Sequence, residues 1–262
     1  MNIRSVTIAD KQQILDFTKS TFEFGDYIAD VFDDWLKEGL FLASEIEEGT
    51  VVGIMHVSFL EDGSAWFEGG RVHPEYRRQG IATALSTAAA EKIRPNIIRT
   101  LIEESNIASK NLVKKFQGTR IMSYGVYEGS YVGEKSKIGK MRVKDIKMVV
   151  DNAGRLGHDW VYSPWKSWQK LNEPALISAV DKTYFTQNGL AVIDDFGDHL
   201  TLALQFFDED AIDDFLKKAG ELAQKLHKKK MIEVHIPKEQ ASLLENRGFK
   251  PLTDLVVYEM NK

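Results

Sequence analysis

The chain has 262 residues, a length that favours two domains of ordinary size. Apolar residues make up 43% and charged residues 28% of the sequence, which is the composition of a folded globular protein and excludes a disordered or fibrous one. The 34 basic and 39 acidic residues give a net charge of −5, which argues against a protein that coats nucleic acid or an anionic membrane. We therefore expect no nucleic-acid partner and no membrane partner.

Cysteine is absent, which excludes disulfides, thiolate zinc sites and a cysteine acyl-enzyme. The N-terminal segment MNIRSVTIADKQQ lacks the apolar core of a signal peptide, and no segment reaches the roughly 18 consecutive apolar residues of a membrane span. His235 and Glu233 lack the spacing of a metal site. These features predict a cytoplasmic protein without a metal.

The first half of the chain mixes strand and helix patterns. Strand patterns occupy six segments, residues 3–8, 41–46, 50–60, 64–72, 97–103 and 120–127. Helical patterns begin near Lys11, at Ile28 and near Gln79, and a fourth covers 108–116. Turn pairs between the second, third and fourth strands predict antiparallel hairpins, whereas the strand-helix-strand crossovers require parallel pairing. The fold class expected is therefore α/β, with helices on both faces of a mixed (α+β) sheet.

The segment with the most chemical information is 72–83, VHPEYRRQGIAT. A strand ends here and a helix begins after a short loop, so unpaired N–H groups and the positive end of the helix dipole face the loop. Gly80 and Ala82 remove side-chain bulk, and Arg77 and Arg78 can form charge-assisted hydrogen bonds. The predicted ligand is a diphosphate; the alternative is that the two arginines only cap a helix on the surface.

The run Arg77-Arg78-Gln79-Gly80-Ile81-Ala82 resembles the [R/Q]-x-x-G-x-[G/A] loop of the GNAT superfamily of acetyl-CoA-dependent N-acyltransferases. The preceding V-x-P-E-Y-R, the following T-A-L and the order of elements are also similar, so the resemblance covers about residues 1–128. It implies the acyl-CoA N-acyltransferase (GNAT) fold, acetyl-CoA or coenzyme A as cosubstrate, and a small-molecule or peptide amine as acceptor.

The resemblance also implies where the cosubstrate binds. The pyrophosphate of CoA would lie on the backbone of the loop, the pantetheine arm beside the strand that ends at Val72, and an asparagine after the next strand would contact the cofactor. The residues implied are Val72, Arg77, Arg78, Gln79, Gly80, Ile81, Ala82, Thr83 and Asn106. Taken alone, Asn106 is more often a helix cap, and the cofactor contact is an equal alternative only in the context of the family resemblance. Gly69 and Gly70 fit a bulge or a close backbone approach, and the alternative is that they only relieve crowding against a helix.

Acyl transfer to an amine needs a neutral nitrogen, and hence a proton acceptor near the thioester. Our candidate for this catalytic base is Glu68, which lies in the strand leading to the loop and, by period-two counting, on the same face as Val72. The alternative is a solvated strand glutamate, and Glu103, Glu104 and His73 are weaker candidates. The family resemblance implies that a backbone N–H near Val72 meets the oxyanion.

The general acid is left open by the sequence. In the family, a tyrosine seven residues after the equivalent of Asn106 commonly protonates the leaving thiolate, and Val113 stands at that position here. Three later tyrosines could replace it only if the fold brings one to the sulfur: Tyr124, Tyr127 and Tyr131. Two functions remain, a CoA-dependent N-acetyltransferase acting through a ternary complex and a non-catalytic acyl-CoA-binding or regulatory protein.

The second half of the chain predicts a degenerate second copy of the same fold. Residues 129–141, rich in Gly, Lys and Ser, are the expected linker between domains 1–128 and 142–262. Strands are expected at 190–194, 199–207, 231–236 and the final DLVVYEM, with helices over 209–227 and before Gly248. The segment LLENRGF resembles the end of the GNAT fold.

The second copy is not expected to bind CoA. Its long helix begins with Asp208, Glu209 and Asp210, whose carboxylates stabilise a helix N-terminus but repel a pyrophosphate. We therefore expect one cofactor site in a monomer or homodimer. Three tryptophans either line an acceptor cleft or belong to the core, Trp160, Trp165 and Trp168.

Overall fold

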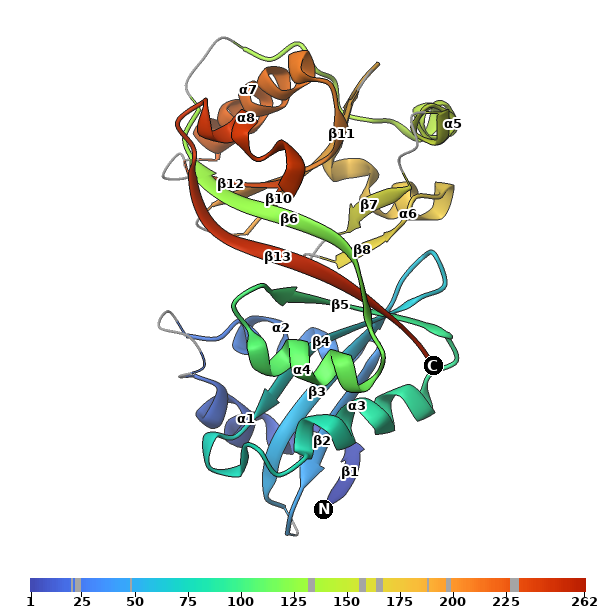
Figure 1. Ribbon diagram of the computed structural model, residues 1–262, viewed down its shortest axis with the longest axis vertical. Helices are drawn as coiled ribbons and strands as arrows, with labels where there is room; N and C mark the ends of the chain where they lie inside the picture. The colour runs from blue at the N-terminus through green and yellow to red at the C-terminus, as the bar shows by residue number, and fades with distance from the viewer. Residues whose placement is uncertain are drawn as a thin grey trace. The chain divides into compact units, whose positions relative to one another are not determined.

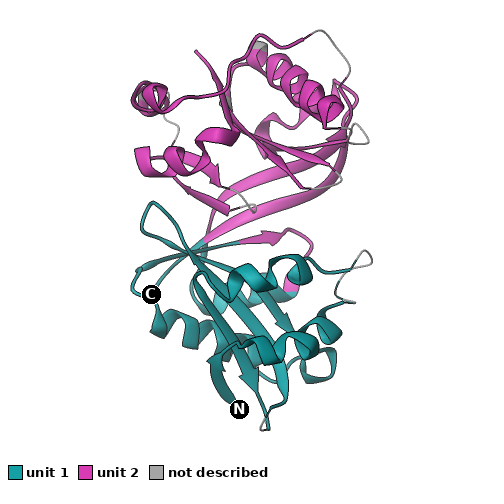
Figure 2. Ribbon diagram, turned by 180° about the vertical axis from the view of Figure 1, so that it is seen from behind, with its two compact units in different colours: residues 1–100, 108–119, 259–262 teal, residues 101–107, 120–258 magenta. Residues whose placement is uncertain are grey.

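The computed structural model describes residues 1–19, 21, 25–47, 49–131, 135–155, 159–163, 167–187, 189–196, 199–226 and 231–262; Trp165 lies outside these ranges. By its internal contacts the chain divides into two compact units (Figure 2). Unit 1 comprises residues 1–100, 108–119 and 259–262, and unit 2 comprises 101–107 and 120–258. Residue 128, the expected domain boundary, lies within strand β6 (Thr119–Gly129).

Unit 1 contains a meander followed by a crossover (Figure 1). Its elements are β1 (Asn2–Ser5), the 3-10 turn η1 (Ile8–Asp10), α1 (Lys11–Thr18), α2 (Ile28–Trp35), β2 (Leu40–Glu45), β3 (Val51–Phe59), β4 (Ala65–Val72), η2 (Pro74–Tyr76), α3 (Ile81–Lys92), most of β5 (Ile97–Glu103) and most of α4 (Ile107–Lys115). The strands follow the order β1-β2-β3-β4-β5. Pairs from β1 to β4 are antiparallel and β4 pairs with β5 in parallel, so the sheet is mixed as expected.

Helices cover both faces of this sheet, as two neighbouring residues of β3 demonstrate. A Cβ atom on Gly53 would lie 2.8 Å from Ile81 of α3. The next residue, Ile54, belongs to the buried cluster that contains Ile28 and Phe32 of α2. Because successive strand residues point to opposite faces, α3 packs on one face and α2 on the other.

Unit 2 repeats the strand-helix-strand crossover. Its elements are most of β6, η3 (Val143–Asp145), α5 (Ile146–Arg155), β7 (Trp160–Ser163), β8 (Ser167–Lys170), α6 (Glu173–Ala179), η4 (Val180–Lys182), β9 (Thr183–Thr186), β10 (Gly189–Asp195), β11 (Leu200–Phe207), α7 (Glu209–Lys225), β12 (Ile232–Pro237), η5 (Lys238–Gln240), α8 (Ser242–Glu245) and most of β13 (Lys250–Asn261). The main strands follow the order β13-β6-β12-β11-β10-β9. Parallel β11 and β12 are joined by α7, just as β4 and β5 are joined by α3. No helix in the described part of the chain is long and apolar enough to cross a membrane.

Candidate active site

The loop between β4 and α3 ends in an uncapped helix. The helix begins at Ile81, two residues after the expected Gln79, because Gly80 adopts a left-handed backbone with φ 82°. No side chain caps this N-terminus, and a Cβ atom on Gly80 would meet nothing within 4 Å. The N–H groups of the first turn have no intrahelical acceptor, so they face open space with the positive end of the helix dipole.

The cations of the loop are not neutralised. Arg77 donates from Nε to the carbonyl oxygen of Val72 (3.3 Å), and both Arg77 and Arg78 are exposed. Among the described residues, neither guanidinium forms an ion pair. Lys115, at the end of α4, adds a third cation by donating from Nζ to Oγ1 of Thr83 (3.5 Å). Lys115 could not be recognised from the sequence, because a basic residue in the last turn of a helix commonly interacts only with the helix dipole.

Strands β4 and β5 pair only where they begin. The parallel pairing joins Ala65 to Ile98 and Trp66 to Arg99 and extends no further. Beyond Trp66, β5 therefore leaves this side of β4 without a strand partner, while Arg71 and Arg77 donate to the carbonyl oxygens of Gly70 and Val72. The pantetheine arm is expected to lie beside β4 like an additional strand, and this position needs a strand edge that no neighbouring strand occupies.

A β-bulge interrupts β4 at its two glycines. Ile54 of β3 is paired with Arg71, whereas His56 is paired with Glu68, so β4 carries one additional residue between these pairs. Gly69 has φ 62°, and a Cβ atom there would lie 2.4 Å from the Trp35 indole. Gly69 therefore forms the predicted bulge and also makes room for α2, while a close approach of a ligand to its backbone stays a prediction.

The bulge corrects the expected orientation of Glu68. Period-two counting put Glu68 and Val72 on one face, but their partners on β3 are His56 and Gly53, which are three residues apart and point to opposite faces. Glu68 therefore lies on the face covered by α2, and Val72 lies on the face covered by α3. Counting failed because the sequence does not reveal that the extra residue is inserted.

Glu68 is hydrogen-bonded and largely buried. Its Oε1 atom accepts from Oγ of Ser58 at 2.5 Å and lies 2.9 Å from Nδ1 of His56. The Glu68 side chain is 15% exposed and His56 is 1% exposed. This burial excludes the alternative that Glu68 is a solvated strand glutamate. The role of Glu68 as a base stays a prediction. Neither Ser58 nor His56 was recognised from the sequence, although alternation along 50–60 places both on one face.

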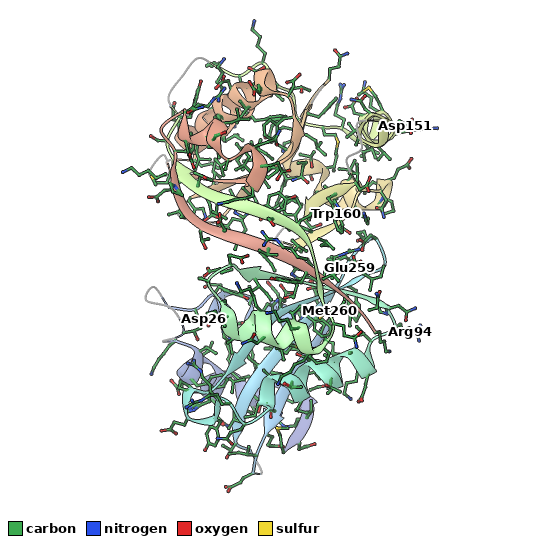
Figure 3. The ribbon with its side chains drawn as sticks, in the orientation of Figure 1. Asp26, Arg94, Asp151, Trp160, Glu259 and Met260 are labelled. Carbon is green, nitrogen blue, oxygen red and sulfur yellow. The ribbon has the colours of Figure 1, made fainter. Side chains whose placement is uncertain are left out.

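A buried ion pair lies on the same face of the sheet. Arg71 donates from Nε and Nη2 to the carboxylate of Asp26, at 2.6 and 3.1 Å (Asp26 is labelled in Figure 3). The guanidinium also lies over the ring of Tyr27, 5.3 Å from its centroid. Although 38% of the Tyr27 surface is exposed, desolvation raises the pKa of its hydroxyl, and the charge of Glu68 adds to this while Arg71 opposes it. The Tyr27 hydroxyl therefore keeps its proton to a higher pH than an ordinary tyrosine does.

The remaining candidates have separate positions. Asn106 follows β5, is exposed, belongs to unit 2 and donates its backbone N–H to the carbonyl of Glu103 (2.9 Å), so its contact with the cofactor stays a prediction. Val113 is buried, with 4% of its surface exposed, and offers no proton. In the described ranges, no group of three or more histidine or acidic side chains is arranged to hold a metal ion.

The aromatic residues of unit 2 are mainly core residues. Tyr124 stacks on Trp168, with centroids 4.1 Å apart, and both are buried. Tyr127 donates its hydroxyl to Oε1 of Glu245 at 2.8 Å, and burial together with this bond raises its pKa to about 12. Tyr131 packs against the buried cluster that contains Tyr127. Nζ of Lys170 lies over the ring of Trp160.

The N-terminus of α7 differs from that of α3. Asp208 caps it by accepting the N–H of Ala211 at Oδ1, 2.9 Å away. The Asp208 carboxylate thus occupies the start of α7 in unit 2, whereas Gly80 leaves the start of α3 in unit 1 open.

Residues 11–118 match the profile of the acetyltransferase (GNAT) family. These residues form a GNAT acetyltransferase domain. No curated protein matches the chain in sequence. A GCN5-related N-acetyltransferase from Sphaerobacter thermophilus has a TM-score of 0.67 and 12% identity, covering 99% of this chain and 95% of that chain. A tandem GNAT protein from the clavulanic acid biosynthesis pathway has a TM-score of 0.63 and 12% identity, covering 99% and 98%.

These similarities confirm the GNAT resemblance and the mixed α/β fold. The matched GNAT domain contains β4, the loop, α3 and Glu68. The tandem GNAT structure extends the agreement in fold to the second half, where the sequence predicted a degenerate copy.

Proposed function

We propose that the protein is an acetyl-CoA-dependent N-acetyltransferase that transfers the acyl group directly to a primary amine in a ternary complex. The acceptor is a small-molecule or peptide amine, and the reaction takes place in the cytoplasm. The observation that carries the proposal is the uncapped start of α3, where Gly80 leaves open space and Arg77 and Arg78 have no carboxylate partner among the described residues. This arrangement suits a diphosphate, as the GNAT family requires.

In the proposed reaction, Glu68 takes one proton from the acceptor ammonium. The nitrogen lone pair then forms the C–N bond with the thioester carbonyl, and a backbone N–H near Val72 stabilises the oxyanion. The C–S bond breaks with its electron pair on sulfur, and the second nitrogen proton neutralises the thiolate. The products are the amide, CoA and the proton held by Glu68.

Val113 stands where the family commonly has a tyrosine, and this difference favours a second candidate function, an acyl-CoA-binding protein without catalysis. No general acid stands at the family's position, because Val113 is apolar and buried. A CoA thiol is acidic enough to leave without much assistance, so we retain catalysis as the first proposal. Thiol release measured across a panel of amines separates the two functions.

The phosphate loop is tested by calorimetry with acetyl-CoA. The wild type should bind one equivalent per chain, because Asp208 occupies the corresponding helix start in unit 2. Gly80→Glu should abolish binding by placing a carboxylate where the diphosphate lies. Gly63→Glu is the matched control, since Gly63 has φ 81° and equally open space but lies between β3 and β4. Unchanged affinity in Gly80→Glu would show that the loop assignment is wrong.

A further inference from the structure

His56 is enclosed by groups that fix its ring. The indole of Trp35 stacks on it, with centroids 4.3 Å apart and planes 3° from parallel. Its Nε2 lies 2.9 Å from the carbonyl oxygen of Glu38, and its Nδ1 lies 2.9 Å from Oε1 of Glu68. Gly39 makes this arrangement possible, because a Cβ atom there would lie 2.8 Å from Nε2 and 2.2 Å from a backbone oxygen.

These partners determine where protons can lie. A carbonyl oxygen only accepts hydrogen bonds, so Nε2 of His56 carries a proton. The other nitrogen faces a carboxyl oxygen, so a second proton must lie between Nδ1 and Oε1 of Glu68. An ionised Glu68 therefore requires a doubly protonated His56, which Trp35 stabilises through its ring face.

The same contacts distinguish the two oxygens of Glu68. Oε1 receives both hydrogen bonds, from Ser58 and from His56. Oε2 receives none from the described part of the chain, and the side chain keeps 15% exposure. One oxygen is thus held in place, and the other is available for a proton from outside the protein.

We propose that His56 is a positioning residue for acyl transfer: through Nδ1 it holds Glu68 ionised and oriented, so that Oε2 accepts the proton of the acceptor amine. This inference rests on the proposed function. Two other cations on this face have carboxylate partners of their own, Arg71 with Asp26 and Arg99 with Asp62. His56 is therefore the cation that balances Glu68.

Two substitutions separate its two hydrogen bonds. Asn places an amide nitrogen at the position of Nδ1, so His56→Asn keeps a neutral bond to Glu68. Gln places its amide nitrogen at the position of Nε2, so His56→Gln keeps only the bond to the Glu38 carbonyl. We expect His56→Gln to lower kcat about ten-fold or more and His56→Asn to lower it less, with the acetyl-CoA Kd unchanged in both.

A double-mutant cycle with Glu68→Gln decides whether His56 acts through Glu68. The expected result is that His56→Gln causes no further loss of kcat in the Glu68→Gln background. An equal fold-loss in both backgrounds, or equal losses for His56→Asn and His56→Gln, would overturn the inference. If His56→Gln does not fold, as judged by its melting curve, the cycle with His56→Asn carries the same test. A wild type without turnover, or a Glu68→Gln protein as fast as the wild type, would instead refute the proposed function.

Discussion

Gly69 lies against the indole of Trp35, and a Cβ atom at Gly69 would come within 2.4 Å of two ring carbons. This contact connects the bulge of β4 to α2. Because the indole also stacks on His56, the position of Gly69 affects the surroundings of Glu68. The bulge and the candidate base therefore depend on one another.

Gly69→Ala should destabilise the protein by about 1–3 kcal/mol, because the new methyl group overlaps Trp35 and the left-handed backbone strains an L-residue. Gly70→Ala is the matched control, since its Cβ atom would meet only Met55, at an ordinary 3.7 Å. Denaturant unfolding measures both. Equal stability of the two variants would contradict the close packing at Gly69.

Arg78 should contribute to ligand binding and not to folding, because it has no polar partner in the described part of the chain. Arg78→Ala should leave the melting temperature unchanged and weaken acetyl-CoA binding about ten-fold or more, the effect of losing a charge-assisted hydrogen bond. Calorimetry at low and moderate salt measures the loss.

Arg94→Ala is the control for net charge. Arg94 is exposed beyond the other end of α3 (Figure 3), so its removal should leave acetyl-CoA affinity unchanged. If Arg78→Ala and Arg94→Ala weaken acetyl-CoA binding equally, the loss comes from the change in overall charge, and the loop does not bind the phosphates.

The sequence predicted the order of elements well because its signals are local. Apolar periodicity and turn pairs located the ends of β3 and β4 within one residue and the start of α3 within two, and the run from Arg77 to Ala82 identified the loop. The start of α3 was placed too early because only the structure shows that Gly80 is left-handed.

The surroundings of the candidate base could not be predicted, because they depend on contacts between distant segments. Asp26 and Arg71 are 45 positions apart, and no local pattern pairs them. The bulge at Gly69 reverses the face of Glu68 relative to Val72 without changing the alternation that the sequence displays. A single inserted residue thus decides which helix covers the candidate base.

Glu68→Gln should slow turnover about 100-fold or more, because an amide cannot accept the proton of the acceptor. The acetyl-CoA Kd should change little, since Glu68 lies on the opposite face from Val72. Steady-state kinetics at saturating substrates, with calorimetry, measure both quantities. Glu91→Gln, at an exposed position of α3, controls for the lost charge. Equal kcat values for Glu68→Gln and the wild type would remove Glu68 from the mechanism.

Asp10 should make the stability of the protein depend on pH in the acid range. Hydrogen bonds from Arg4, at 2.8 Å, hold the pKa of this buried carboxyl below its ordinary value of 3.8, and bonds from Thr7 act in the same direction. The native state therefore binds this proton less readily than the unfolded state. The stabilisation is present above about pH 4 and is lost as the pH falls through the lower native value.

Asp10→Asn should accordingly be less stable than the wild type by about 1.5–3 kcal/mol near neutral pH, and the difference should shrink as the pH falls below about 4. Urea unfolding at a series of pH values measures the difference. Asp151→Asn, at an exposed position of α5 (Figure 3), should show no comparable trend. A constant difference between wild type and Asp10→Asn across this range would mean that Asp10 stabilises the protein through its shape and not through its charge.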